Sequence, residues 1–387
     1  MVGLIELKFN KYNLYHYIYS LILGLSCTLG LFLILFYRKN NLVIITSPKL
    51  SGNAEAFYLM CKENKIQARF LTTNLNDYKL LKSKKIKVMF YLNPFHVAKV
   101  FKSQSILATH GIYFISFIKL FSKTKLINIR HGVITIGKDS NLQNKTKFIK
   151  HSKKFDKYCF LSEKELQIVQ NHLSHEFSNN FIFEFPHIEY VKKLSLNKQN
   201  LKKKMELNSS KKYILIANTD IRNNTDTKNS VFSIYNIEYL AFLDNLVENL
   251  DAKVILKPHW KTKFNSSEKK MIRSFKNIIY REDLIKNFDS ELKAISDILI
   301  TDWSTVYIDV LKNIKEIMFV NNSYPDRQRT NNTTMENKFI NRVETFTELQ
   351  NNILKSINLD NQSKTVLGLR SLFLQNSEKD LNKLIYH

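Results

Sequence analysis

Short apolar runs alternate with helix-like stretches along the chain after residue 40, and this alternation limits the fold more than any other feature. In the first half, runs of strand length lie at residues 41–47, 68–72, 87–92, 106–109, 126–130, 158–161 and 181–185. Such continuous apolar runs are typical of strands that are buried on both faces. Helical patterns lie between them, for example at residues 53–64 and 112–121 and from Glu163 onward. This order predicts a parallel, doubly wound α/β sheet.

A second series of the same kind follows a polar, lysine-rich stretch at residues 192–212. Its predicted strands lie at residues 213–218, 253–257, 277–280, 297–301 and 316–320, and its predicted helices at 237–249, from Ser304, and from Thr345 onward. We therefore expect a Rossmann-like domain at residues 41–200 and a second one, with C-terminal helices, at residues 201–387. Ligands bind at the carboxyl ends of parallel strands, so a cleft between two such domains suits a nucleotide-linked substrate.

The N-terminal segment lacks charge over residues 14–37. Its length is about that needed to cross a hydrocarbon core of ~30 Å, and tyrosines stand at both ends, as interfacial aromatics do. A cleaved signal peptide is disfavoured, because no small-residue cleavage site precedes Arg38; a buried core helix is the other alternative. We expect residues 1–40 to form an N-terminal anchor with one transmembrane helix in the inner membrane, and the rest of the chain to lie in the cytoplasm.

The formal net charge is +25, from 59 Lys and Arg against 34 Asp and Glu. This charge fits either a polyanionic partner or a general compositional bias toward Lys, Asn, Ile and Phe. Because the lysines are spread along the chain, the bias is favoured as the main cause. A basic face would still help to hold an anionic substrate at a membrane.

Several chemistries are disfavoured by the motifs that the sequence lacks. It has neither a Walker-type phosphate loop nor a Gly-x-Gly-x-x-Gly motif, which argues against a P-loop kinase and a classical NAD enzyme. The three cysteines are far apart and form no Cys-x-x-Cys pair, a usage that suits a reducing compartment. We expect no cofactor and no metal site.

Two of the eight glycines directly follow a histidine at the end of a predicted strand, as His110-Gly111 and His131-Gly132. Glycine at such a position permits a tight turn or the close approach of a ligand. A histidine there titrates near neutral pH and can act as a general base or as a hydrogen-bond donor to phosphate. The alternative is a histidine that merely caps or packs, and it is weaker for His131 than for His110.

A second candidate site follows the predicted strand at residues 253–257, with the string Lys257-Pro258-His259-Trp260. The proline ends the strand and fixes the turn, so the lysine and histidine lie together at its carboxyl end. An anionic group would bind well there, although an incidental surface pair is the simpler alternative.

A third candidate site follows the predicted strand at residues 297–301, where the chain continues into Asp302, Ser304 and Thr305 and then a predicted helix. Asp302 or Ser304 can cap that helix, and its free N–H groups can bind phosphate together with the hydroxyls. Simple N-capping would explain one of these residues but not all three.

The order of these motifs resembles the CDP-glycerol glycerophosphotransferase family, whose members build teichoic acids and related glycerol- or ribitol-phosphate capsule polymers. The resemblance covers residues 107–320. It rests on the strings NIRHGVITIG, YILIANTDIR and LKPH and, above all, on SDILITDWSTVYIDVLKNIKEIMFV. It implies a GT-B-like fold at the cytoplasmic face of the membrane, with the acceptor in the N-terminal domain and the CDP-linked donor in the C-terminal domain.

The resemblance also implies roles for single residues. By position, His131 resembles the proposed catalytic base of the family, and His259 resembles the histidine that contacts the donor phosphates. Two departures bear on which donor or acceptor is used: Arg222 lies in a string one residue longer than the family's Thr-Trp-Arg, and Arg130 replaces the aromatic before His-Gly. The expected site residues are His131 and His259 as catalytic groups; Gly132, Arg222, Lys257, Asp302, Ser304 and Thr305 at the donor phosphates; and His110 and Gly111 on the acceptor side.

The expected reaction moves an alditol phosphate, most simply glycerol phosphate, from a CDP-alditol to a hydroxyl of a lipid-linked or polymeric acceptor, with release of CMP. A GT-B glycosyltransferase that uses a nucleotide sugar is the nearest alternative, because fold alone does not decide function. A membrane-tethered, non-catalytic binder of nucleic acid or another anion is a third. We expect no nucleic-acid partner, because no DNA- or RNA-binding signature occurs in the sequence.

Overall fold

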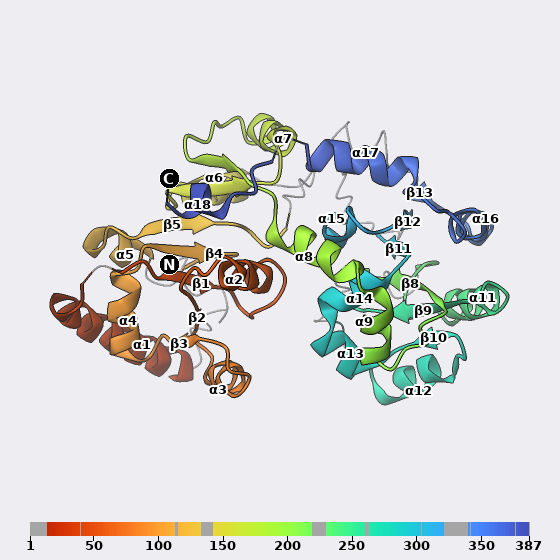
Figure 1. Cartoon of the computed structure of the whole chain (residues 1–387), viewed down its shortest axis with the longest axis horizontal. Helices are drawn as coiled ribbons and strands as arrows, with labels where there is room; N and C mark the ends of the chain where they lie inside the picture. The colour runs from red at the N-terminus through yellow and green to blue at the C-terminus, as the bar shows by residue number, and fades with distance from the viewer. Residues whose placement is uncertain are drawn as a thin grey trace. The chain divides into compact units, whose positions relative to one another are not determined.

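The computed structural model of the chain describes residues 14–38, 40–112, 115–132, 142–218, 230–259, 262, 264–302, 304–320, 340, 342–375 and 377–386. These residues form two compact α/β units (Figure 1). The first draws on Met1–His131, Asn141–His187 and Asn376–His387, and the second on Gly132–Ser140 and Ile188–Gln375.

The first unit contains a parallel sheet of seven strands among the described residues, in the order β3-β2-β1-β4-β5-β6-β7. Its strands are β1 (Val43–Thr46), β2 (Ala68–Thr72), β3 (Val88–Phe90), β4 (Ser105–Ala108), β5 (Lys125–Asn128), β6 (Lys157–Phe160) and β7 (Asn180–Ile182). Its connecting helices are α2 (Asn53–Glu63), α3 (Leu75–Ser83), α4 (Pro94–Phe101), α5 (Ile115–Phe121), α6 (Leu142–Ser152) and α7 (Glu163–Leu173). The strand order reverses between β1 and β4, which makes their carboxyl ends the natural ligand edge of this sheet.

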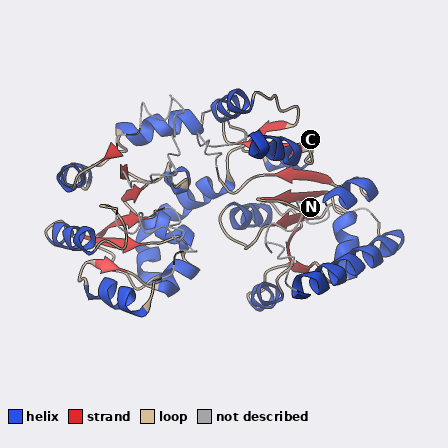
Figure 2. Cartoon of the chain, turned by 180° about the vertical axis from the view of Figure 1, so that it is seen from behind, coloured by secondary structure: helices blue, strands red, loops and turns tan. Residues whose placement is uncertain are grey.

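The second unit contains a parallel sheet that has six strands in the part of the chain described, ordered β10-β9-β8-β11-β12-β13. Its strands are β8 (Lys212–Ile216), β9 (Ala252–Leu256), β10 (Ile278–Ile279), β11 (Ile298–Thr301), β12 (Glu316–Val320) and β13 (Arg342–Val343). Its helices include α9 (Lys198–Lys204), α11 (Ile237–Glu248), α12 (Ser266–Ser274), α13 (Glu282–Asn287), α14 (Asp289–Ile295), α15 (Val306–Val310), α16 (Phe346–Ser356) and α17 (Lys364–Phe373), while α8 (Pro186–Ser195) crosses the boundary between the units. Figure 2 shows its strands with helices beside them. The order reverses between β8 and β11.

Buried apolar side chains explain why these runs form central strands. Every residue of β1, β4 and β11 is buried, as expected for strands covered on both faces. In the second unit, Ile214, Val254 and Ile300 belong to one core that also contains apolar residues of α11 and α16. The two parallel α/β sheets are those that the alternating pattern predicts.

The end of the chain returns to the first unit, a placement that the sequence did not predict. In α18 (Leu381–Ile385), Leu384 is fully buried in the core formed around β1, β5 and β6. Lys125 Nζ donates a hydrogen bond to the carbonyl of Tyr386 (2.6 Å), and Lys157 Nζ donates one to the carbonyl of Lys383 (2.6 Å). The C-terminal helix thereby closes one side of the first sheet.

The predicted transmembrane helix is wrong, and with it the single-pass anchor. The uncharged segment forms α1 (Leu14–Leu33) and a short 3₁₀ turn, η1 (Ile34–Phe36). Across the described ranges, no helix combines the length and the apolar character needed to cross a membrane. One face of α1 packs against protein instead: Leu23 is 1% exposed, and Ser26 Oγ donates to the carbonyl of Tyr91 (3.1 Å).

Glycine allows this packing to be close. A Cβ atom added to Gly30 would lie 2.7 Å from Cγ1 of Val97 in α4, so a side chain at this position would force the two helices apart. An uncharged run is compatible with a membrane span and with a helix packed on its own domain. The contact between α1 and α4, which are distant in sequence, favours the helix packed on its own domain.

Candidate active site

The two sequence-predicted histidines of the first unit lie side by side. The rings of His110 and His131 stack with centroids 4.3 Å apart and planes 10° from parallel. His110 follows β4 and His131 follows β5, and these strands are neighbours in the sheet. Because parallel strands end at the same edge, two residues far apart in sequence meet there.

Thr109 links both rings to the end of β1. Its Oγ1 atom bonds Ser47 Oγ (2.8 Å) and His110 Nδ1 (2.9 Å), and its backbone receives a hydrogen bond from the His131 imidazole. Asn128 Nδ2 donates to the carbonyl of His110 (2.9 Å). The cluster therefore lies at the carboxyl ends of β1, β4 and β5, where the strand order reverses.

Both imidazoles are held in the neutral form. Burial, followed by the neighbouring His131, lowers the pKa of His110 to about 4. His131 remains exposed as a residue, but the protein around its ring and the charge of Arg130 lower its pKa below the usual value. A neutral imidazole that donates one N–H to a carbonyl keeps a lone pair on its other nitrogen, and can accept a proton there.

Arg130, which replaces the aromatic residue of the family motif, faces the protein interior. It is 4% exposed, and its NH2 group bonds both carboxylate oxygens of Glu165 (2.7 Å each). The guanidinium lies 5.1 Å from the ring centre of Phe160 and 5.3 Å from that of Phe185. The buried side chain of Arg130 therefore anchors the segment after β5 to the interior of the first unit.

The backbone of Arg130 is also fixed. It adopts a left-handed conformation with φ of 51°, which is uncommon for a residue with a side chain. Asn128 Oδ1 accepts its N–H (2.8 Å), and Asn53 Nδ2 donates to its carbonyl (3.0 Å). These bonds offset the cost of that conformation and set the direction in which the chain enters His131.

The second unit brings its predicted residues to one sheet edge in the same way. Lys257 and His259 follow β9, whereas Ser304 and Thr305 follow β11, and β8 lies between these strands. Lys257, His259, Ser304 and Thr305 are all partly exposed. A lysine, an imidazole and two hydroxyls at one edge supply the donors that phosphate oxygens accept.

The segment after β11 differs in detail from the expectation. Helix α15 has only five residues, and its N-cap, Thr305, makes no side-chain cap bond. Ser304 Oγ accepts the N–H of Val306 at 3.4 Å, and Asp302 is completely buried. The hydroxyls are thus better placed than the carboxylate to meet a ligand.

Gly132 groups with the second unit and approaches Thr305 closely. A Cβ atom at this position would lie 3.0 Å from Thr305 Oγ1, so a larger residue would push the hydroxyl away. Gly111 is partly exposed. Arg222 lies outside the described residues, as do the tryptophans at 260 and 303.

Sequence reasoning missed the acidic partner of Lys257. Its Nζ atom lies 2.8 Å from Asp289 Oδ1, at the start of α14. No sequence motif predicts this pair, because the two residues are far apart in sequence and the aspartate lies in an ordinary helical stretch. Within the residues that the structure covers, no group of three His, Cys, Asp or Glu side chains is arranged to hold a metal ion.

Comparison with solved structures identifies the fold. The wall teichoic acid polymerase TagF is similar with a TM-score of 0.63 and 14% sequence identity, over 97% of this chain and 96% of that one. A co-structure of S. aureus MnaA with UDP gives a TM-score of 0.51 at 13% identity, over 89% of this chain and 94% of that one. At these identities the likeness shows a GT-B-like fold alone.

Sequence comparison with family models is more informative, although no curated protein matches the chain. The model of the CDP-glycerol:poly(glycerophosphate) glycerophosphotransferases matches residues 29–379. The match includes both His-Gly pairs and the segment after β11. Because it spans most of both α/β units, this protein belongs to the CDP-glycerol:poly(glycerophosphate) glycerophosphotransferase family and is a transferase that uses CDP-glycerol.

Proposed function

We propose that this enzyme transfers glycerol phosphate from CDP-glycerol to a hydroxyl of a lipid-linked or polymeric acceptor, in the synthesis of a teichoic acid-like or capsular polymer. The observation that carries the proposal is the imidazole of His131. It is held at a ligand-binding sheet edge, its N–H is bonded to Thr109, and its pKa is lowered. This is the state in which a histidine serves as a general base at neutral pH.

In the reaction, an oxygen of the acceptor hydroxyl attacks the phosphorus that carries glycerol. The bond from that phosphorus to the bridging oxygen breaks, and the electron pair leaves with CMP. His131 takes the proton of the attacking hydroxyl, a role that typically contributes ~10²–10⁴-fold to the rate. His110 keeps the ring of His131 in place by stacking, and with Gly111 it forms the acceptor side of the site.

The second unit would hold the donor. Lys257, His259, Ser304 and Thr305 present a cation and donor groups at one sheet edge, which suits the charge that develops on the leaving pyrophosphate oxygens. Gly132 leaves room beside Thr305, and Arg222 would add a second cation. The burial of Asp302 supports a structural role for this residue, away from direct contact with the donor phosphates.

We also propose that the enzyme works at the cytoplasmic face of a membrane, attached to its surface by α1. The face of this helix opposite α4 exposes large apolar side chains, among them Leu21 (65%), Leu25 (57%) and Phe32 (71%). An apolar helix face on a protein with a formal net charge of +25 suits a helix that lies in the lipid headgroup region. Replacing these three residues by serine should release the enzyme from anionic vesicles in a flotation assay without unfolding it. Unchanged flotation would exclude α1 as the contact.

The donor is tested with the full-length protein, because α1 is partly buried against α4. CDP-glycerol, CDP-ribitol and a panel of nucleotide sugars are supplied with and without a lipid-linked acceptor analogue, and the released nucleotide is measured. Release of CMP from CDP-glycerol is expected. Release of a nucleoside diphosphate from a sugar donor would instead support the glycosyltransferase alternative.

A further inference from the structure

Four alternating charges form a continuous chain in the second unit. Lys257 Nζ lies 2.8 Å from Asp289 Oδ1, and Lys293 Nζ lies 2.7 Å from Asp289 Oδ2. The same Lys293 Nζ atom lies 3.0 Å from Asp309 Oδ2. This chain of charges begins at Lys257 after β9, passes through α14 and ends in α15, so it joins the segment after β9 to the helix that follows Ser304 and Thr305.

Lys293 is the buried centre of this chain. It is 5% exposed, and its carbonyl accepts a hydrogen bond from Asn313 Nδ2 (3.0 Å), which anchors the helix locally. Burial alone would lower the pKa of Lys293, but Asp289 and Asp309 raise it above the usual value. Burial alone would raise the pKa of Asp289, but Lys257 and Lys293 hold it well below its usual range. The charges of Asp289 and Lys293 are thus maintained by their neighbours.

The two oxygens of Asp289 serve different partners. Oδ1 pairs with the partly exposed Lys257, and Oδ2 pairs with the buried Lys293. If Lys257 turns toward a phosphate, Asp289 keeps a cation at its other oxygen. Without Lys293, the same movement would leave the partly exposed carboxylate of Asp289 without a cation, which is a less favourable state.

We propose that Lys293 is a positioning residue that allows Lys257 to exchange Asp289 for the donor pyrophosphate. The inference rests on the proposed donor site and adds how its lysine becomes available. Asp289 then acts as a competitor for Lys257 in the empty enzyme, and Lys293 weakens that competition by sharing the carboxylate. Asp309 neutralises Lys293 and ties the arrangement to the segment that follows Ser304 and Thr305.

The test compares Lys293→Met, Asp289→Asn and the double variant, with the KM for CDP-glycerol and the Kd for CDP as readouts. In Lys293→Met, Lys257 is the one lysine of this chain of charges left to pair with the carboxylate of Asp289, so the carboxylate holds it more tightly. The KM for CDP-glycerol should therefore rise about tenfold, while kcat at saturating donor changes much less. In the double variant the KM should return most of the way to the wild-type value, since the neutral amide at position 289 no longer competes for Lys257.

The single variant Asp289→Asn shows whether Asp289 raises or lowers the KM for CDP-glycerol. This variant remains informative if Lys293→Met fails to fold. We expect the KM for CDP-glycerol to fall severalfold, because Lys257 is released while Lys293 still pairs with Asp309. A purely structural role of Asp289, as a clamp that aims Lys257, would raise the KM instead. A rise in Asp289→Asn, or a double variant no better than Lys293→Met, would overturn the inference.

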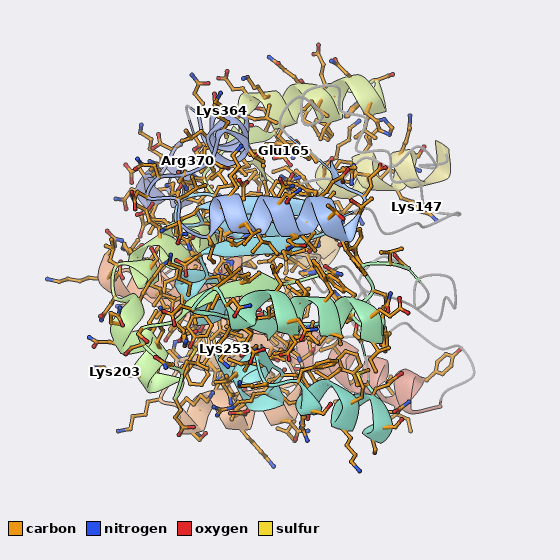
Figure 3. All side chains as sticks on the ribbon, turned by 90° about the vertical axis from the view of Figure 1, so that its right-hand side faces the viewer. Lys147, Glu165, Lys203, Lys253, Lys364 and Arg370 are labelled. Atoms are coloured by element: carbon orange, nitrogen blue, oxygen red, sulfur yellow. The ribbon has the colours of Figure 1, made fainter. Side chains whose placement is uncertain are left out.

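Lys253→Met is the matched control. This lysine lies on the same strand, β9, and its Nζ atom donates hydrogen bonds to the carbonyl of Lys276 (3.1 Å) and to Oδ1 of Asn277 (2.7 Å); it is labelled in Figure 3. The KM of this variant should equal that of the wild type. If the wild-type enzyme fails to release CMP from CDP-glycerol, the proposed function fails. If it turns over but the variants do not follow the pattern above, only the inference about Lys293 fails.

Discussion

The two α/β units carry different side chains at the same edge of the same kind of sheet. In the first, the segments after β1, β4 and β5 carry Ser47, Thr109 and two stacked imidazoles. In the second, the strand ends carry Lys257, an imidazole and two hydroxyls. In the mechanism that we propose, the first edge holds a neutral base and the second meets negative charge. A shared architecture therefore provides the location of a site, and the few residues after each strand decide its chemistry.

The units also differ in how they treat charge. The first buries the ion pair of Arg130 with Glu165, next to His131 in the sequence. The second leaves Lys257 partly exposed and balances it through Asp289 and Lys293. A fixed pair suits a group that must keep one orientation, whereas a shared pair suits a lysine that must change partners.

The largest effect is expected on kcat, when the proposed base His131 is replaced and the donor site is left unchanged. His131→Gln removes the proton acceptor but keeps a side chain of similar polarity, so kcat should fall by ~10²–10⁴-fold. The rate of CMP release from CDP-glycerol measures this loss. Near-normal turnover would remove His131 from the mechanism.

A second change tests whether the buried pair is structural. Glu165→Ala leaves the Arg130 guanidinium buried without its carboxylate, and breaking such a pair typically costs about 3–5 kcal/mol of unfolding free energy. Denaturant unfolding measures it. Lys119→Met, which breaks the exposed Lys119–Asp156 pair of the same unit, is the control and should cost below about 1 kcal/mol. Equal losses of unfolding free energy in the two variants would contradict a structural role for the buried pair.

A smaller effect is expected at the second edge. Lys257→Met removes one charge-assisted contact with phosphate, which should raise the KM for CDP-glycerol about tenfold. Steady-state kinetics with varied donor measures this, and kcat should change less than the KM. A loss confined to kcat would place Lys257 in the chemical step and weaken the division between the two edges.

The smallest effect concerns pH. The pKa of His131 is lowered, so the base is neutral and active above a value that lies below 6.5. As pH rises through that pKa, kcat/KM should increase and then level off before neutrality. His110, with a pKa of about 4, stays neutral over this range and should add no second limb. A limb centred above pH 6.5 would indicate that the surroundings of His131 differ from those described.

Much of the fold could be predicted because its signals are local. The predicted strands at residues 68–72 and 316–320 have the same bounds as β2 (Ala68–Thr72) and β12 (Glu316–Val320). Candidate site residues could be named because they directly follow such strands. The sheet then brings His110 beside His131, as parallel strands end at one edge.

The remaining features depend on contacts between distant segments. The packing of α1 on α4 depends on Gly30 meeting Val97, which no pattern within the uncharged run reveals. The return of α18 to the first sheet is non-local in the same way. The pairing of Lys257 with Asp289 joins an expected residue to one without a recognisable motif. These are the places where packing, more than local preference, decides the structure.

The division of labour between the two edges is tested most directly by the binding of CDP, measured by titration calorimetry on the wild type, His131→Gln and Lys257→Met. CDP should bind His131→Gln with the affinity of the wild type, although that variant is inactive, and should bind Lys257→Met about tenfold more weakly. Weaker binding in His131→Gln, with wild-type binding in Lys257→Met, would contradict the assignment of the base to one unit and the donor phosphates to the other.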